Sequence, residues 1–114
     1  MITIFGIKNC DTMKKAFRWL DDNHIEYVFH DYKKEGLDEA TAKAWVDKLG
    51  WENLINKRGT TWRKLEEETK NTMNNEQAVR TMVNQPSIIK RPLLILKDGV
   101  HLGFDVQDYT QKLL

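Results

Sequence analysis

A tight turn between two apolar segments near the C-terminal end restricts the fold more than any other feature. Residues 93–97 (LLILK) form an almost continuous apolar run, Asp98-Gly99 follows directly, and residues 100–104 (VHLGF) form the next segment. An Asp-Gly pair between two such segments is typical of a two-residue β-hairpin turn. A continuous apolar run is typical of a strand buried on both faces. The sequence therefore predicts two antiparallel strands here.

A strand, a helix and a second strand are predicted at the start of the chain. Residues 2–6 (ITIFG) and 26–30 (EYVFH) are rich in β-branched and aromatic residues, as strands are. Between them, residues 13–20 carry apolar side chains at the i, i+3, i+4 and i+7 positions of a helix, with Asp11 or Thr12 as the expected N-cap. Two strands joined by a helix are normally parallel, so this segment predicts a βαβ unit.

The middle of the chain carries helix signals only. Asp38 is the expected N-cap of a helix that ends at Gly50, and residues 62–69 are expected to form one short helix. Residues 74–77 resemble a capping box ahead of a helix that ends before Pro86.

The order βαβ, helical segment, ββα is that of the thioredoxin-like fold. We therefore expect an α/β protein with a four-stranded mixed sheet and an α-helical insertion between its two halves. The expected organisation is a single domain over residues 1–114, with a core of residues 1–35 and 88–114 and an insert of about residues 36–87.

Composition excludes several classes of protein. The chain has 114 residues, 40% of them hydrophobic, and its 18 basic and 17 acidic residues give a net charge of +1. This balance is typical of a soluble globular protein and argues against direct binding to nucleic acid. No apolar run approaches the ~20 residues of a membrane span, and the first residues lack a signal-peptide pattern. We expect a cytoplasmic protein without membrane contact.

The single cysteine limits the chemistry. Cys10 has no partner for an internal disulfide, and the histidines, His24, His30 and His101, lack metal-ligand spacing. Neither a metal site nor a bound cofactor is expected. Cys10 stands just before the first predicted helix, where unpaired N–H groups and the helix dipole favour a thiolate, the reactive form. The alternative is that Cys10 is a small buried apolar residue.

Two neighbouring features refine this hypothesis. Met13 occupies the second position of a CxxC spacing, and methionine cannot resolve a mixed disulfide. Chemistry at Cys10 therefore requires an external thiol, for which glutathione is the obvious cytosolic candidate, or stops at a reversibly oxidised sulfur. The segment Arg91-Pro92 precedes the buried strand, where Arg91 can bind an anion if this loop lies beside Cys10.

Other polar clusters have ordinary explanations. Lys57-Arg58 and Arg63-Lys64 form a basic cluster that is more typical of a solvated surface. The segment His30-Asp31-Tyr32 is expected simply to close the second strand.

Several segments together resemble the arsenate reductase-like family, which comprises the ArsC, Spx and YffB branches. They are residues 6–16 (GIKNCDTMKKA), 31–32 (DY), 54–65 (LINKRGTTWRKL), 85–93 (QPSIIKRPL) and 100–104 (VHLGF). The resemblance extends over nearly the whole chain in the family's order, and it is closest to the YffB branch.

The resemblance implies a thioredoxin-like core with a helical insert, and Cys10 matches the family's nucleophilic cysteine. Pro92 matches a proline that is cis beside that cysteine, and Arg91 matches an arginine that binds oxyanion in arsenate reductases. A further arginine of those enzymes lies close to Arg58 in a gapless comparison, and another falls at about Phe104, which is not basic. An oxyanion needs several fixed donors, so arsenate reduction is the weaker expectation.

The expected function is that of a glutathione-dependent monothiol thiol-disulfide reductase, as resemblance to the YffB branch implies. Cys10 is the expected nucleophile, glutathione the co-substrate, and a disulfide or other oxidised compound the substrate. The residues expected to bind glutathione or substrate are Lys8, Asn9, Arg58, Arg91 and Pro92. One alternative is a non-catalytic regulator that binds RNA polymerase or another protein, as the Spx branch does, although Met13 removes that branch's CxxC switch. Arsenate reductase proper is the other.

Overall fold

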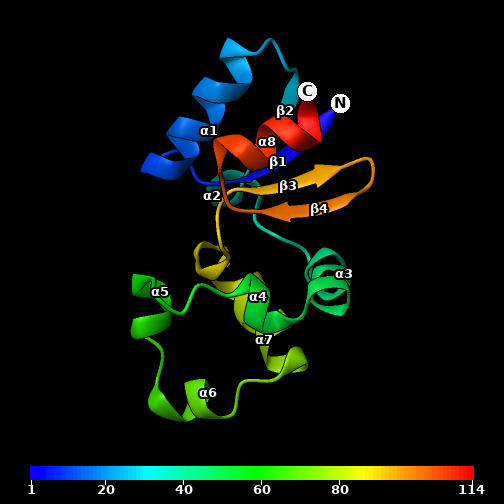
Figure 1. The fold of residues 1–114 in the computed structure, drawn as a ribbon. Helices are drawn as coiled ribbons and strands as arrows, with labels where there is room; N and C mark the ends of the chain where they lie inside the picture. Colours follow the sequence, from blue (N-terminus) through cyan, green and yellow to red (C-terminus); the bar gives the residue numbers. More distant parts are fainter. The chain divides into compact units, whose positions relative to one another are not determined.

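The computed structural model describes residues 1–114 and contains one four-stranded mixed sheet (Figure 1). The strand order is β2-β1-β3-β4, with β1 (Ile2–Gly6) parallel to β2 (Tyr27–Asp31). Strand β3 (Leu93–Leu96) is antiparallel to both β1 and β4 (Gly99–Leu102). The prediction of a thioredoxin-like fold with a mixed sheet is confirmed.

Helices α1 (Asp11–Asp22) and α8 (Val106–Leu113) lie on the same face of this sheet (Figure 1). Their apolar stripes bury one cluster, because the helical spacing of the stripe and the alternation of the strands point these side chains to a common face. The fully or almost fully buried members of the cluster are Ile4, Met13, Ala16, Leu20, Leu94 and Tyr109.

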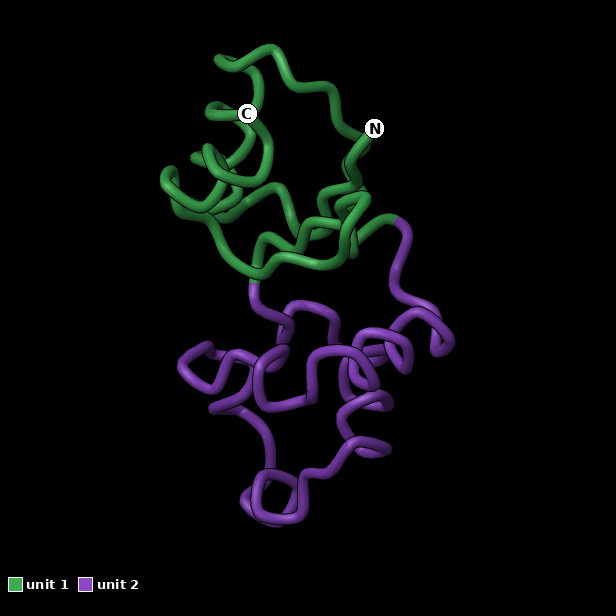
Figure 2. The backbone as a smooth tube through the Cα atoms, turned by 45° about the vertical axis from the view of Figure 1, so that its right-hand side comes forward, with its two compact units in different colours: residues 1–34, 91–114 green, residues 35–90 purple.

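The chain divides into two compact units (Figure 2). The first unit, residues 1–34 and 91–114, contains the sheet with α1 and α8. The second unit, residues 35–90, is helical. The short helix α2 (Tyr32–Glu35) lies at the junction of these ranges. The expectation of a single domain with an insert stays a prediction.

The second unit consists of short helices. They are α3 (Glu39–Leu49), α4 (Trp51–Leu54), α5 (Thr60–Arg63), α6 (Glu67–Asn71), α7 (Asn75–Asn84) and the 3-10 turn η1 (Pro86–Ile88). Helix α3 packs against α7. Each begins at a side-chain cap: Asp38 Oδ1 accepts a 2.7 Å hydrogen bond from the Thr41 N–H, and Asn74 Oδ1 accepts a 2.9 Å bond from the Gln77 N–H.

Two local expectations are wrong. The N-cap of α1 is Cys10 itself and not Asp11 or Thr12, because the helix already begins at Asp11. Residues 62–69 form parts of two helices instead of one. Glu66 is extended there and serves as the N-cap of α6, whose first turn carries further carboxylates that favour a helix start.

No helix of the structure is long and apolar enough to cross a lipid bilayer.

A substitution at Gly6 tests how tightly the first unit is packed below Cys10. A Cβ atom at Gly6 would meet Sδ and Cε of Met13, whose side chain is fully buried. Because the buried Met13 side chain would have to shift within the core, we expect Gly6→Ala to lower the free energy of unfolding by about 1–3 kcal/mol, measured by urea denaturation.

The matched background is Met13→Val, which removes the two atoms that the new methyl group would meet. In that background Gly6→Ala should cost much less, because the clash is gone. Equal losses in both backgrounds would contradict this explanation.

Candidate active site

Cys10 lies where the chain leaves β1 and enters α1. Its backbone is extended (φ −148°, ψ 126°), its N–H donates a 3.0 Å hydrogen bond to the Lys8 carbonyl, and its carbonyl accepts the first helical bond, also 3.0 Å, from the Lys14 N–H. The side chain is half-buried. The thiol therefore lies at the N-terminus of a twelve-residue helix, as predicted.

The surroundings of the sulfur favour its charged form. Partial burial raises the pKa of the Cys10 thiol, but polar contacts with the Met13 N–H, the Arg91 side chain and the Thr12 N–H outweigh burial, so the net pKa is lowered. The two N–H groups lie near the sulfur, but Cys10 does not form a regular side-chain capping hydrogen bond with either of them. The Arg91 guanidinium contributes both a hydrogen bond and its positive charge. A larger fraction of Cys10 is therefore in the thiolate form near neutral pH than in an ordinary cysteine.

Arg91 reaches the thiol because of the way in which β3 enters the sheet. Strand β3 runs antiparallel to β1, with Leu93 opposite Phe5, so the residues before β3 lie at the edge where β1 ends. The Arg91–Pro92 peptide bond is cis, Pro92 is buried, and the Pro92 carbonyl accepts a 2.8 Å hydrogen bond from the Gly103 N–H. The structure thus brings Cys10, Arg91 and Pro92 to one edge of the sheet.

The other predicted binding residues are exposed to solvent. Lys8 and Asn9 are exposed in the turn that presents Cys10. Arg58 is exposed in the second unit, where its N–H donates a 3.0 Å hydrogen bond to Asn56 Oδ1. Their roles in binding glutathione stay predictions.

Met13 cannot take part in thiol exchange. Its side chain is fully buried in the apolar cluster of α1, α8 and the sheet, so its thioether is not available to a substrate. Of the two positions of the CxxC spacing, only the first, Cys10, carries a thiol.

No sequence pattern marks Tyr32 as part of the site. Predicted only to close a strand, Tyr32 follows the end of β2 and buries its ring and hydroxyl at the edge that holds Cys10 and Arg91. The signal that points to it is topological, because ligands of α/β sheets bind at the carboxyl ends of parallel strands.

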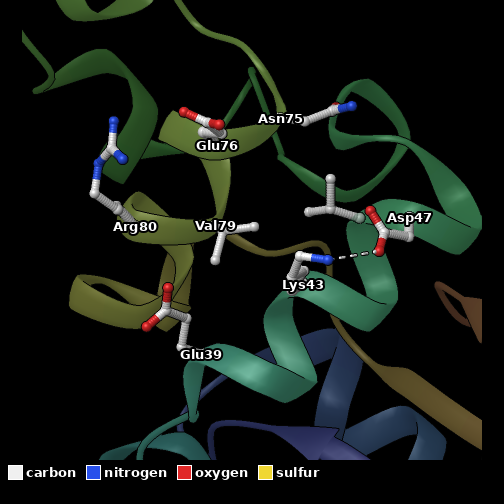
Figure 3. A pocket seen from close by; sticks show the side chains of 8 residues that line it. Glu39, Lys43, Asp47, Asn75, Glu76, Val79 and Arg80 are labelled. Carbon is white, nitrogen blue, oxygen red and sulfur yellow. Dashed lines mark hydrogen bonds and ion pairs between the residues drawn. The ribbon is translucent and has the colours of Figure 1, made fainter.

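A pocket of about 330 Å³ lies between α3 and α7 in the second unit (Figure 3). Val46 and Val79 form its apolar part, and Lys43 Nζ pairs with Asp47 Oδ2 at 3.4 Å on its rim. The remaining lining residues are Glu39, Asn75, Glu76 and Arg80. No cysteine or histidine and none of the predicted site residues line this pocket, so the thiol chemistry does not belong to it.

The sequence profile of the ArsC family matches residues 5–112. The chain belongs to the ArsC family. The ArsC-family fold is shared with the solved structure of the YFFB (PA3664) protein, with a TM-score of 0.95 and 42% identity over 100% of both chains.

Two further relatives of this ArsC-family chain are named for different functions, one for arsenate reduction and one for transcriptional regulation. The solved structure of an arsenate reductase (ArsC) related protein from Brucella melitensis is 47% identical, with a TM-score of 0.80, and the match covers 96% of this chain and 92% of that one. The global transcriptional regulator Spx 2 of Lactococcus lactis is 26% identical over 110 residues, which are 95% of this chain and 83% of that protein.

The contribution of Arg91 to the thiolate can be measured directly. Because Arg91 contributes a hydrogen bond and a charge that both lower the Cys10 pKa, we expect Arg91→Ala to raise that pKa. The rate of Cys10 alkylation by iodoacetamide, measured as a function of pH, should then reach its half-maximum at a higher pH than in the unchanged protein, with slower alkylation at neutral pH.

Arg18→Ala is the matched control, because Arg18 is exposed on α1 and is not among the groups that shift the Cys10 pKa. It removes the same charge from the same unit and should leave the pH profile nearly unchanged. An equal shift in both variants would show that only net charge matters.

Proposed function

We propose that this ArsC-family chain is a glutathione-dependent thiol-disulfide reductase in which Cys10 is the only protein thiol. The observation that carries the proposal is the lowered pKa of Cys10, whose sulfur lies at the N-terminus of α1 with the Arg91 guanidinium bonded to it. These are the surroundings of reactive cysteines. The cytoplasm is the proposed location, since glutathione is the reductant there.

The absence of a second reactive sulfur favours a two-step exchange. The Cys10 thiolate attacks the glutathione sulfur of a mixed disulfide R–S–S–G, forms the Cys10–glutathione disulfide and expels R–S⁻. The thiolate of a second glutathione then attacks the glutathione sulfur of that intermediate, which releases the Cys10 thiolate and leaves oxidised glutathione. The substrate R–S–S–G is thereby reduced and glutathione is oxidised.

The remaining residues are proposed to bind glutathione. In the reduced protein Arg91 lies beside the Cys10 sulfur, where its positive charge stabilises the attacking thiolate. Lys8 and Asn9 lie in the turn before Cys10, where they can donate hydrogen bonds to a glutathione carboxylate. Pro92 shapes the loop beside the thiol.

Mass spectrometry after incubation with oxidised glutathione tests the proposal. We expect the protein to gain one glutathione at Cys10 and to lose it on addition of reduced glutathione. Cys10→Ser should gain none and should reduce a small mixed disulfide at less than about 1% of the normal rate, because the nucleophile is gone. An ordinary Cys10 pKa together with no mixed disulfide would refute the proposal.

A second candidate function is that of a non-catalytic regulator with a protein partner. Its support is the 26% identity to a global transcriptional regulator over 95% of this chain. The discriminating variant is again Cys10→Ser. Full function in cells, with a stable complex recovered by affinity purification, would favour the regulator, whereas loss of function would favour the reductase.

Arsenate is a poorer substrate for this site. Phe104 stands where a further cation is expected from the resemblance, and its ring packs edge-on against Tyr109 with centroids 4.8 Å apart. Arsenate would therefore lack one of its fixed positive partners.

A further inference from the structure

Tyr32 buries a hydroxyl group that has no hydrogen-bond partner. The residue is only 5% exposed, and its hydroxyl oxygen is among the few buried side-chain atoms without a partner in the protein. Burial of an unpaired hydroxyl costs free energy, so such a group in a folded protein requires an explanation.

The position of Tyr32 relates this hydroxyl to the thiol. Gly6, the last residue of β1, pairs with Asp31, and Tyr32 follows directly. The ring centroids of Tyr32 and Phe5 lie 6.1 Å apart. Phe5 of β1 pairs with Leu93 of β3, which directly follows the Arg91–Pro92 segment. The ends of β1 and β2 and the start of β3 lie at one edge of the sheet (Figure 1). Tyr32, Cys10 and Arg91 follow or precede these strand ends in the sequence and therefore lie at that edge.

Arg91 acts on both groups. Burial raises the pKa of Tyr32, and the positive charge of Arg91 opposes that rise. The same guanidinium donates a hydrogen bond to the Cys10 sulfur. Since its pKa is raised, Tyr32 stays a neutral phenol at physiological pH, and its oxygen can accept a hydrogen bond.

Formation of a mixed disulfide changes what Arg91 can bond to. When the Cys10 thiolate attacks oxidised glutathione, a Cys10–glutathione disulfide forms, the glutathione disulfide breaks, and glutathione thiolate leaves with the negative charge. The Cys10 sulfur is then neutral and a weak acceptor, so Arg91 loses a charge-assisted hydrogen bond.

We propose that Tyr32 is a positioning residue of this reaction, whose hydroxyl oxygen accepts the Arg91 hydrogen bond once Cys10 has entered a mixed disulfide. In the reduced protein Arg91 donates a hydrogen bond to the Cys10 sulfur, and the Tyr32 oxygen has no hydrogen-bond partner. In the mixed disulfide Arg91 turns to Tyr32, which stabilises the intermediate. This inference rests on the proposed glutathione chemistry and adds a residue to it.

Tyr32→Phe separates this role from a structural one, because it keeps the ring and removes only the hydroxyl. Each protein is equilibrated at a series of ratios of oxidised to reduced glutathione, and the fraction of mixed disulfide is measured by mass spectrometry after acid quenching. We expect the equilibrium constant for mixed disulfide formation to fall about tenfold, the effect of losing one hydrogen bond to a charged group.

The reduced variant should behave differently from a damaged protein. Its Cys10 pKa should be unchanged, and its free energy of unfolding should be unchanged or higher, because the lost hydroxyl had no partner. Tyr27→Phe is the matched control: the Tyr27 hydroxyl bonds to Asp21, and Arg91 is not among the groups that shift the Tyr27 pKa. It should leave the equilibrium constant unchanged.

A double-mutant cycle with Arg91→Ala tests the coupling. If Tyr32 acts through Arg91, Tyr32→Phe should have little effect on mixed disulfide formation when Arg91 is absent. An unchanged equilibrium constant in Tyr32→Phe, or an equal decrease with and without Arg91, would overturn the inference. If the unchanged protein forms no mixed disulfide, the proposed function itself fails, whereas a normal mixed disulfide in Tyr32→Phe removes only the role of Tyr32.

Discussion

The negative charge on the Cys10 sulfur depends on a balance between burial and a small set of polar contacts. Partial burial opposes the charge, and the Met13 N–H, the Arg91 guanidinium and the Thr12 N–H together outweigh it, so that the Cys10 pKa is lowered. Two of these contacts are backbone groups at the start of α1, which have no partner inside the helix. The third comes from a distant part of the chain. The lowered pKa of Cys10 depends on keeping these three groups near its sulfur.

The sheet is what keeps them there. Parallel pairing of β1 and β2 places both carboxyl ends at one edge, and antiparallel entry of β3 starts that strand at the same edge. Helix α1 begins from this edge with Cys10 as its cap, and it is held by the buried cluster that includes Met13 and Ala16. The apolar core thus holds the start of α1, with Cys10, against the strand ends.

Met13 and Tyr32 show how the site differs from that of a dithiol protein. Met13 supplies buried apolar packing in place of a second thiol. Tyr32 adds a buried neutral hydroxyl whose pKa the charge of Arg91 lowers. The strand ends thus carry one thiol and one buried hydroxyl without a hydrogen-bond partner.

Local sequence signals determined much of this protein. The Asp98-Gly99 turn, the apolar stripe of residues 13–20 and the strand-forming run of residues 2–6 sufficed to predict the mixed sheet and the position of Cys10 before a helix, because turn chemistry and periodicity act over a few residues. The same signals failed where short-range preferences compete. The cap of α1 is Cys10, one or two residues before the predicted Asp11 or Thr12, and residues 62–69 break at Glu66.

Only the tertiary structure decided which distant side chains meet the sulfur. That Arg91 bonds to Cys10, and that Tyr32 is buried without a hydrogen-bond partner, follows from the register of three strands and from burial. Neither can be obtained from residue spacing along the chain, because register and burial arise from contacts between segments that are remote in sequence.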